Sequence, residues 1–541
     1  MTLFAQIPAF LLAAAPSFTS RMTDTLFDDT FKGIHHLEFF DWAILIPYFS
    51  VLAVLSVYGL HRYETIRGYL KHRRQVRDAA PPMHFAELPR VTIQLPIFNE
   101  RFVVERLLEE TSKMDYPRHL LQIQVLDDST DDTHPFTEEL VREYQESGLP
   151  IEYIHRTNRY GYKAGALENG LKTATGEVVA VFDADFVPPR DFLECTVHHF
   201  TDPKVGMVQT RWTYLNRGHN VLTEVQAILL DGHFALEHIA RAGGGLFFNF
   251  NGTAGILRKS MIQDAGGWQH DTLTEDSDLS YRAQLKGWKF VYAPGVECPS
   301  ELPVETYSFQ VQQSRWAKGL TQVAMKLLPQ ILRSKLPWRV KAEAFFHLTP
   351  NIGYPLMIVV STLMLPVMIV RFYMGWLEIV LIDLPLIAAS FWSISAFYVV
   401  AQRELFPNNW KRSILFLPAL MAAGVALTII NTKAVIEALV GYQTAFARTA
   451  KYGAQKSLAN SQYRRRSGWL PYAELAAGAG FLAIVVYAIQ SYNYLSLPFL
   501  LLFVGGYFWA GVTTLWEEYQ GKLAFERQRA LASTQTQAAK A

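Results

Sequence analysis

The sequence predicts an α/β domain with a largely parallel sheet, inserted between membrane-spanning α-helices. Between residues 80 and 320, short apolar runs rich in β-forming residues alternate with segments of helical spacing, which is typical of such a sheet. On either side of this stretch the chain is apolar. Half of the 541 residues are hydrophobic and only 18% are charged, against about 25% in an average soluble protein.

Four β-strands are expected in this domain, and three of them end in polar or acidic residues. The strands cover 91–97, 122–127, 151–155 and 177–182, with helices at 102–111 and 163–172. The first, second and fourth strands are followed by Asn99-Glu100, Asp127-Asp128 and Asp183-Ala184-Asp185. Because ligands bind at the carboxyl ends of strands in such sheets, we expect these side chains to meet at one edge. No Gly-x-Gly-x-x-Gly follows the first strand, which argues against a dinucleotide site.

Apolar segments of bilayer length flank the domain. Residues 42–60 contain no charge and predict a transmembrane helix. Basic residues between 61 and 77 place the following domain on the cytoplasmic side, so that 1–41 form an extracytoplasmic or interfacial segment. Further apolar segments lie at about 350–371, 383–402, 413–435, 470–490 and 495–516.

Basic residues on both sides of 413–435 leave the path of this segment open. Both flanks carry basic residues, which are typical of cytoplasmic loops. A segment that crosses the membrane once cannot join two cytoplasmic loops. The segment is therefore either interfacial or re-entrant, or it is an exception to the charge rule. We expect five or six spans, a C-terminal membrane region over 346–516 and a cytoplasmic tail over 517–541. The composition of 532–541 predicts a disordered end.

Charge and cysteine content exclude several classes of protein. The net charge is +1, which predicts no nucleic-acid partner. The only cysteines are Cys195 and Cys298, so neither a disulfide framework nor a Cys-rich metal site is expected. We interpret both cysteines as packing residues.

Asp183 and Asp185 follow an apolar strand directly. Two carboxylates two residues apart at a strand end can hold a hard divalent cation, Mg²⁺ or Mn²⁺, between themselves and a diphosphate. Such a cation would neutralise the charge that develops on a leaving nucleotide diphosphate. The alternative is a solvated turn, which this pattern alone favours.

Thr274-Glu275-Asp276 precedes a predicted helix at 277–287. Asp276 could be a general base that deprotonates an acceptor hydroxyl. The alternative is that a carboxylate at this position only caps the helix.

Gln312-Gln313-Ser314-Arg315-Trp316 places a guanidinium beside an indole. An arginine can pair with a diphosphate, and a tryptophan offers a flat face for a sugar ring. The alternative is that the two side chains anchor the chain at a membrane boundary.

The motifs Asp-Asp, Asp-x-Asp, Thr-Glu-Asp and Gln-x-x-Arg-Trp occur in this order, and together they resemble the processive family 2 glycosyltransferases. Segments such as LDDSTDDT, FDADFVPP, FFNFNGTAGI and QQSRWAKG carry the likeness over most of residues 90–320. It is closest to the plant cellulose-synthase-like A and C groups. The resemblance implies a GT-A-type, Rossmann-like catalytic domain over 80–316. It also implies inverting transfer from GDP-mannose or UDP-glucose onto a β-1,4-linked glycan (mannan, glucomannan or glucan), processive and coupled to export.

The resemblance further implies a role for each residue that matches the motifs. Asp276, with Glu275 beside it, would be the catalytic base, and Asp185 with Asp183 would hold Mg²⁺ or Mn²⁺. The nucleotide sugar would be bound by Asn99, Glu100, Asp127 or Asp128, Lys163, Asp183, Gln312, Arg315 and Trp316. The end of the acceptor glycan would lie near Asn251, Gly252, Thr253 and Trp316.

Residues 317–345 predict amphipathic interfacial helices, with Pro329 bending the first of them. The alternative is a helix that packs against the core of the catalytic domain. In the membrane region, the aromatic residues Phe391, Trp392, Phe397 and Tyr398 are candidates for lining a glycan tunnel.

A loop at 441–466 is similar to the gating loop of cellulose synthases. Phe446, Thr449 and Lys451 match its Phe-x-Val-Thr-x-Lys pattern, and Arg448 departs from it. The alternative is a basic juxtamembrane loop.

Two other functions compete with processive synthesis. One is a non-processive membrane transferase that glycosylates a lipid, and the other is a non-catalytic membrane scaffold, which would be expected to lack Asp185 or Asp276. The expected partners are a nucleotide-sugar donor, a glycan acceptor and the lipid bilayer, with room for accessory or homo-oligomeric partners. Because the sequence has no long plant-like insert, a bacterial inner membrane is favoured.

Overall fold

The computed structural model describes residues 35–372, 376–444, 467–491 and 493–538. Its contacts divide the chain into two compact units. One comprises Met1–Leu60 with Leu356–Ser393, and the other comprises His61–Pro355 with Ile394–Ala541. The second unit holds every residue of the candidate site described below.

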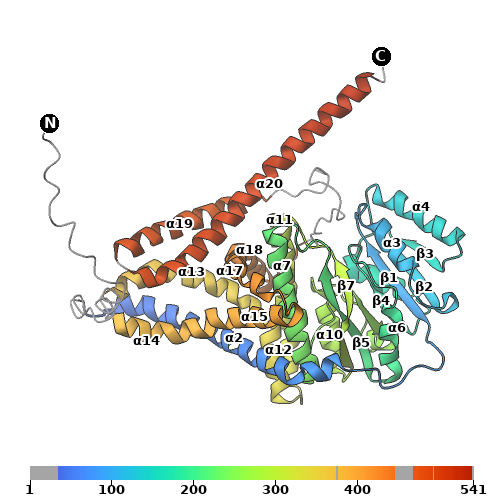
Figure 1. The fold of residues 1–541 in the computed structure, drawn as a ribbon, viewed down its shortest axis with the longest axis horizontal. Coiled ribbons are helices and arrows are strands. Elements are labelled where there is room, and N and C mark those ends of the chain that lie inside the picture. Colours follow the sequence, from blue (N-terminus) through green and yellow to red (C-terminus); the bar gives the residue numbers. More distant parts are fainter. Residues whose placement is uncertain (1–34, 373–375, 445–466, 492, 539–541) are drawn as a thin grey trace. The chain divides into compact units, whose positions relative to one another are not determined.

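The second unit contains a seven-stranded mixed sheet with the order β3-β2-β1-β4-β6-β5-β7. Figure 1 labels most of these strands. The strands are β1 (Val91–Ile97), β2 (Leu121–Asp127), β3 (Ile151–His155), β4 (Val178–Val181), β5 (Val205–Tyr214), β6 (Gly255–Arg258) and β7 (Lys289–Ser300). The first four run parallel, so their carboxyl ends share one edge. β6 runs antiparallel to both of its neighbours, whereas β5 and β7 run in the same direction as β4, so the sheet is largely parallel, as predicted.

Helices cover both faces of this sheet. Alternate residues of β1, such as Ile93 and Leu95, join one core cluster with side chains from α3 (Val104–Ser112), α4 (Thr133–Glu146) and α6 (Phe192–Val197). The opposite face packs against α5 (Tyr162–Leu171), α8 (His238–Gly243), α9 (Lys259–Asp264) and α10 (Glu275–Leu285). Short 3₁₀ turns lie at η2 (Arg118–Leu120) and η3 (His198–Thr201). Burial on both faces explains why these strands read as continuous apolar runs.

A long helical stretch between β5 and β6 contains one π-helical turn. It consists of α7 (Val221–Gly232), η4 (His233–Glu237) and α8, and Asn220 caps its start by accepting a hydrogen bond from the Thr223 amide at 2.8 Å. π-Helical turns are rare and often mark functional sites. Two residues of this turn, His233 and Glu237, line the cavity described below.

The helix α11 (Thr306–Arg333) begins before Gln312, so the Gln-x-x-Arg-Trp motif lies inside it rather than ahead of it. One apolar side of α11, including Val323 and Leu327, packs against α12 (Trp338–Leu348). Met325, Leu332 and Trp338 are exposed. The helix pair therefore has a core-packing face, as in the alternative interpretation, and an exposed apolar face that suits the predicted interfacial role.

Within the part of the chain that the structure describes, five helices are long and apolar enough to cross a membrane. They are Phe39–Arg77, Pro350–Arg371, Leu381–Leu405, Leu470–Gln490 and Tyr494–Leu523. The remaining candidate, Trp410–Ala426 with Thr428–Leu439, is bent by 43° and makes six spans if it counts as one. This bend lies inside the segment 413–435, whose path the charge pattern leaves open.

The helical elements of this region are α2 (Phe39–Arg77), η5 (Pro350–Ile352), α13 (Gly353–Arg371), α14 (Trp376–Ile387), η6 (Ala388–Trp392), α15 (Ser393–Leu405), α16 (Trp410–Ile414), α17 (Leu417–Ala426), α18 (Thr428–Leu439), α19 (Leu470–Gln490), η8 (Tyr494–Ser496) and α20 (Leu497–Ala538). Within the first unit, Leu45 of α2 packs with Val367 and Val370 of α13.

Two expectations about single segments are wrong. The end predicted to be disordered is helical as far as Ala538, because no glycine or proline follows Gly521 and strong helix formers such as alanine and glutamine are frequent there. Cys195 is exposed and is not a packing residue, because it faces outward from α6, whereas Cys298 is buried as expected.

Candidate functional site

A cavity of about 590 Å³ lies beside the carboxyl ends of β1, β2 and β4. It brings together most of the residues that the sequence motifs predict, namely Glu100, Asp128, Lys163, Asp183, Asp185, Asn251, Gly252, Glu275, Asp276, Gln312, Arg315 and Trp316. Asn99, Asp127 and Thr253 are not part of its lining. Phe446, Thr449 and Lys451, the predicted gating-loop residues, lie outside the described residues.

The structure separates the two neighbouring aspartates that follow β2. Asp127 is fully buried, and its Oδ1 accepts a hydrogen bond from the Ser129 amide at 2.8 Å. Its Oδ2 accepts one from the Tyr153 hydroxyl at 2.6 Å. Asp128 lines the cavity and is held by Arg156, whose Nε donates to Oδ1 at 2.8 Å. Of the two aspartates, Asp128 is therefore the one placed to contact a ligand.

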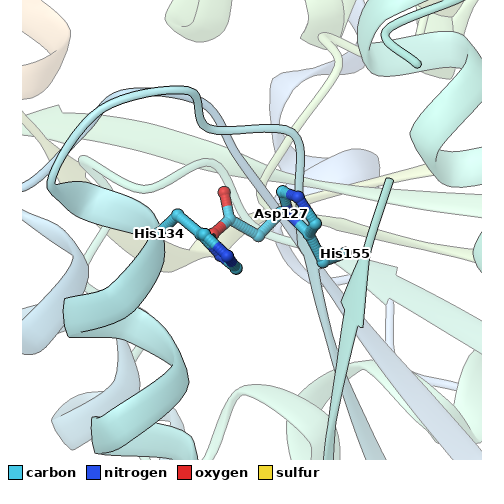
Figure 2. A group of neighbouring side chains, drawn as sticks. All are labelled: Asp127, His134 and His155. Carbon is cyan, nitrogen blue, oxygen red and sulfur yellow. The ribbon is translucent and has the colours of Figure 1, made fainter. Parts of the chain in front are cut away.

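Two histidines that sequence reasoning missed lie beside Asp127. Figure 2 shows Asp127, His134 and His155 converging from the end of β2, the start of α4 and the end of β3, and their potential metal-ligating atoms lie within 4.8 Å of one another. The two imidazole rings stack, however, with centroids 4.0 Å apart, and His134 Nδ1 lies 2.6 Å from the Tyr153 hydroxyl. Because stacked rings direct their nitrogen lone pairs side by side rather than toward one point, we interpret this group as a support for the turn after β2.

Asn99 also has a supporting position. Its backbone has a positive φ of 55°, and its side-chain Oδ1 accepts a hydrogen bond from the Thr130 amide at 2.8 Å. Its own amide donates to the Ser129 hydroxyl at 2.8 Å. Asn99 therefore ties the turn after β1 to the turn after β2, and the adjacent Glu100 reaches the cavity.

Lys163 connects the ends of three segments. Its ammonium donates hydrogen bonds to Asp183 Oδ1 and to the Gly252 carbonyl, the latter at 2.9 Å. The Asp183 amide in turn donates to the Thr253 hydroxyl at 2.9 Å, so Thr253 positions the Asp-x-Asp turn from behind. Burial opposes the charge on Lys163, but the carboxylates of Asp183 and Glu275 outweigh it and raise the pKa of Lys163.

Asp276 lies in the first turn of α10, where its Oδ1 accepts a hydrogen bond from the Ser277 amide at 2.7 Å. Burial, reinforced by the negative charge of Glu275, raises the pKa of Asp276 to about 7. Gly252 packs against this carboxyl group. A Cβ at Gly252 would lie 2.9 Å from Asp276 Oδ2, and the φ of +84° also favours glycine.

Gln312, Arg315 and Trp316 lie three and four residues apart on α11 and therefore share one face of the helix. All three line the cavity. Burial lowers the pKa of the Arg315 guanidinium, while the carboxylates of Glu275 and Asp183 act in the opposite direction. The site thus combines cationic side chains, Lys163 and Arg315 among them, with a group of carboxylates.

The cavity is also lined by residues outside these motifs, most of which sequence reasoning did not find. They include Trp212 and Tyr214 of β5, His233 and Glu237 of the π-helical turn, and Tyr354 and Tyr398. Tyr398 is one of the four aromatic residues predicted for a glycan tunnel, whereas Phe397 is buried in the core. Tyr354 and Tyr398 belong to helices that are apolar enough to span a membrane.

Comparison with known proteins identifies the domain that carries these motifs. Residues 89–319 match the model of "Glycosyltransferase like family 2". This segment is a family 2 glycosyltransferase domain. It runs from just before β1 to just after Trp316, so the predicted resemblance is confirmed, and the mixed sheet is the predicted GT-A-type fold.

Curated relatives of the family 2 domain have a common activity in their names. "Glucomannan 4-beta-mannosyltransferase 1" of Oryza sativa subsp. japonica is 41% identical over 268 residues, which are 48% of this chain and 51% of that protein. "Glucomannan 4-beta-mannosyltransferase 7" of Arabidopsis thaliana is 40% identical over 258 residues, 46% of each chain. The chain thus spans about half the length of the curated relatives it matches.

Among solved structures, the mannosyltransferase PcManGT from Pyrobaculum calidifontis, in complex with GDP-Man and Mn²⁺, is similar at 23% sequence identity and a TM-score of 0.45. The match covers 66% of this chain and 99% of that one.

Proposed function

We propose that this protein is a membrane-embedded, inverting mannosyltransferase that extends a β-1,4-linked mannan or glucomannan from GDP-mannose. The observation that carries this proposal is the cavity in which Asp183 and Asp185, Asp276, and Arg315 with Trp316 meet. The names of the relatives favour mannose over glucose as the transferred sugar. UDP-glucose is the alternative donor that the sequence motifs allow.

The charges in the cavity suit a nucleoside diphosphate. Lys163 and Arg315 provide two cations, and a guanidinium is well matched to phosphate oxygens. Asp183 and Asp185 provide carboxylate oxygens at one strand end, which is the donor type that Mg²⁺ and Mn²⁺ prefer, and we assign these two residues to the cation. When bound, the cation would neutralise negative charge on the leaving diphosphate.

Asp276 is the group that we assign to the base. It would take the proton of the acceptor hydroxyl, whose oxygen bonds to the anomeric carbon while the bond from that carbon to the diphosphate breaks. The nucleoside diphosphate leaves with the electron pair. One direct displacement inverts the anomeric centre, so an α-linked donor gives a β-linked product. Trp316 would stack on a sugar ring, and Asn251 and Gly252 would lie beside the acceptor end.

The membrane helices support synthesis coupled to export. The cavity passes from Asp276 to Tyr354 and Tyr398, on helices that are candidates for membrane spans. A growing chain could therefore move from the site of reaction toward the membrane region. In this proposal the catalytic domain is cytoplasmic, as the basic residues after 60 predict, and a bacterial inner membrane remains the favoured location.

The test of this function uses membranes that contain the full-length protein, incubated with radiolabelled GDP-mannose or UDP-glucose and either Mg²⁺ or Mn²⁺. Insoluble label from GDP-mannose, released by β-mannanase and absent in Asp185→Asn or after chelation, would support the proposal. Label confined to lipid extracts would replace it with the non-processive alternative. No incorporation from GDP-mannose, with or without incorporation from UDP-glucose, would overturn the mannosyltransferase assignment.

Transfer is expected to become faster as the pH rises through about 7. Only the deprotonated form of Asp276 can accept a proton, and the raised pKa of this carboxyl leaves much of it protonated below about 7. The check is kcat/KM for GDP-mannose between about pH 5.5 and 8.5, at a saturating cation concentration. A rate that is constant on the acid side of about 7 would contradict the assignment of Asp276 as the base.

A further inference from the structure

Four side chains that line the cavity, Trp212, Tyr214, His233 and Glu237, lie outside the motifs that contain Asp183 and Asp276. They combine aromatic rings with the carboxylate of Glu237. Aromatic faces and hydrogen-bonding groups together are suited to a sugar ring, which has an apolar face and polar edges. This chemistry indicates a ligand other than a nucleotide.

His233 and Arg241 hold Glu237 by one of its two carboxylate oxygens. His233 Nδ1 lies 2.8 Å from its Oε2, and Arg241 Nη1 donates to the same oxygen at 3.2 Å. The side chain of Glu237 is 31% exposed, and it lines the cavity. Burial opposes its charge, but Arg241 and His233 outweigh that effect and hold the pKa of Glu237 well below its usual range. Oε1 of a charged carboxylate is therefore available to accept hydrogen bonds from a ligand.

A hydrogen-bonded chain connects Glu237 to the reacting end of the cavity. Asn251 Nδ2 lies 2.9 Å from His233 Nε2, and Asn251 Oδ1 lies 2.7 Å from His238 Nε2. With the Asn251 amide donating to His233 Nε2, the Nδ1 proton of that histidine is directed to Glu237. Gly252, the next residue after Asn251, lies against Asp276. The hydrogen-bonded chain from Glu237 thus ends one residue away from the glycine that lies against Asp276.

Two buried hydrogen-bonding groups on β5 complete this group of side chains. The indole Nε1 of Trp212 and the hydroxyl of Tyr214 are buried and have no hydrogen-bond partner among the described residues. The two residues are two apart on a strand, so their side chains lie on the same face. Phe186 and Phe234 hold the Trp212 ring, with centroids at 5.2 and 5.1 Å. Because buried donors usually have an acceptor, these groups also indicate a polar ligand.

We propose that Glu237, Trp212 and Tyr214 form an acceptor subsite that binds the hydroxyls of an internal sugar of the growing chain. Glu237 is its specificity-determining residue. The inference rests on the proposed function and goes beyond it: an acceptor that reaches this subsite should bind more tightly than one that occupies only the position beside Asp276. The enzyme would therefore favour oligosaccharides over a single sugar.

The test compares the wild-type protein with Glu237→Gln, which keeps the size of the side chain and removes its charge. Both full-length proteins are assayed with GDP-mannose and β-1,4-mannooligosaccharides of increasing length. In the wild type, KM for the acceptor should fall as the acceptor grows long enough to reach the subsite. In Glu237→Gln, KM for long acceptors should rise about 10-fold, because a charge-assisted hydrogen bond is replaced by a neutral one. KM for GDP-mannose should not change.

The controls separate a lost subsite from a damaged protein. Glu224→Gln changes a carboxylate of the same helical stretch that pairs with Arg217 and does not line the cavity, so it should leave the length dependence intact. Trp212→Phe replaces the indole with a smaller phenyl ring, which removes the N–H and part of the aromatic face together, and it should weaken the binding of long acceptors in the same direction as Glu237→Gln. Oligosaccharide binding, followed by tryptophan fluorescence without donor, gives a readout that does not need transfer.

The outcomes distinguish this inference from the proposed function. If the wild type transfers mannose but Glu237→Gln and Trp212→Phe keep the wild-type dependence on acceptor length, the subsite is overturned and the function stands. If the wild type transfers no mannose and binds no mannooligosaccharide, both proposals are overturned.

Discussion

Asp276→Asn is expected to lower kcat by about 10²–10⁴-fold while binding of the nucleotide sugar is retained, because an amide cannot take the proton of the acceptor hydroxyl. The side chain lies in the same cavity as Lys163 and Arg315, and Gly252 approaches it closely. Asparagine has nearly the same shape, so the close contact is preserved. The measurement is the rate of mannose incorporation at saturating donor and acceptor, together with the affinity for GDP-mannose.

Two matched variants sharpen this prediction. Glu275→Gln changes the neighbouring carboxyl of the same helical turn. It should lower kcat less than Asp276→Asn does, since Asp276 is the residue beside Gly252. Asp264→Asn changes an aspartate of the same domain that pairs with Lys286 and does not line the cavity, and it should keep wild-type activity. A larger loss in Glu275→Gln than in Asp276→Asn would move the role of base to Glu275.

Much of the sheet could be predicted because its signals are local. β1 to β4 are apolar runs with polar ends, and the structure has them within one residue of the predicted limits. β6 is only four residues long, and β7 is largely half-exposed and contains Pro294 and Gly295, so neither gives a clear run. The antiparallel direction of β6 depends on its pairing with β4 and β5, which no local pattern encodes.

The site could be predicted only in part, for a similar reason. Asp183, Asp276 and Arg315 belong to motifs whose spacing is visible along the chain, and the cavity brings them together. The difference between Asp127 and Asp128 arises from side-chain partners on β3 and in the turns, which the sequence does not reveal. In the sequence, Glu237 cannot be distinguished from any other glutamate in a helix, because a single π-helical turn does not alter the hydrophobic pattern.

Arg241→Met is expected to destabilise the protein by about 3–5 kcal/mol, because it leaves the partly buried carboxylates of Glu237 and Glu343 without the arginine that both contact. The Arg241 side chain is 4% exposed, and its Nε donates to Glu343 Oε1 at 2.8 Å. Burial opposes the charge on Glu343, but His61 and Arg241 outweigh it and lower the pKa of Glu343 to about 2. Loss of Arg241 would leave His61 as the remaining hydrogen-bond partner of Glu343 and would remove one of the two groups that hold Glu237. The measurement is the midpoint of thermal unfolding in detergent, followed by tryptophan fluorescence.

The cause of that loss can be separated from the mere removal of an arginine. Arg67 pairs with Glu64 at the surface with 76% of its side chain exposed, and Arg67→Met should leave the midpoint unchanged, since exposed pairs contribute little. Combining Arg241→Met with Glu343→Gln should recover part of the loss, because one of the carboxylates left behind becomes neutral. Two results would contradict this explanation: a double variant that is less stable than Arg241→Met, or an Arg241→Met variant that is as stable as the wild type. Either would show that the contacts of Arg241 with Glu237 and Glu343 do not stabilise the protein. If both variants behave as expected, the network that holds Glu237 at the cavity wall also contributes to the stability of the fold, so the acceptor subsite and the fold depend on the same buried arginine.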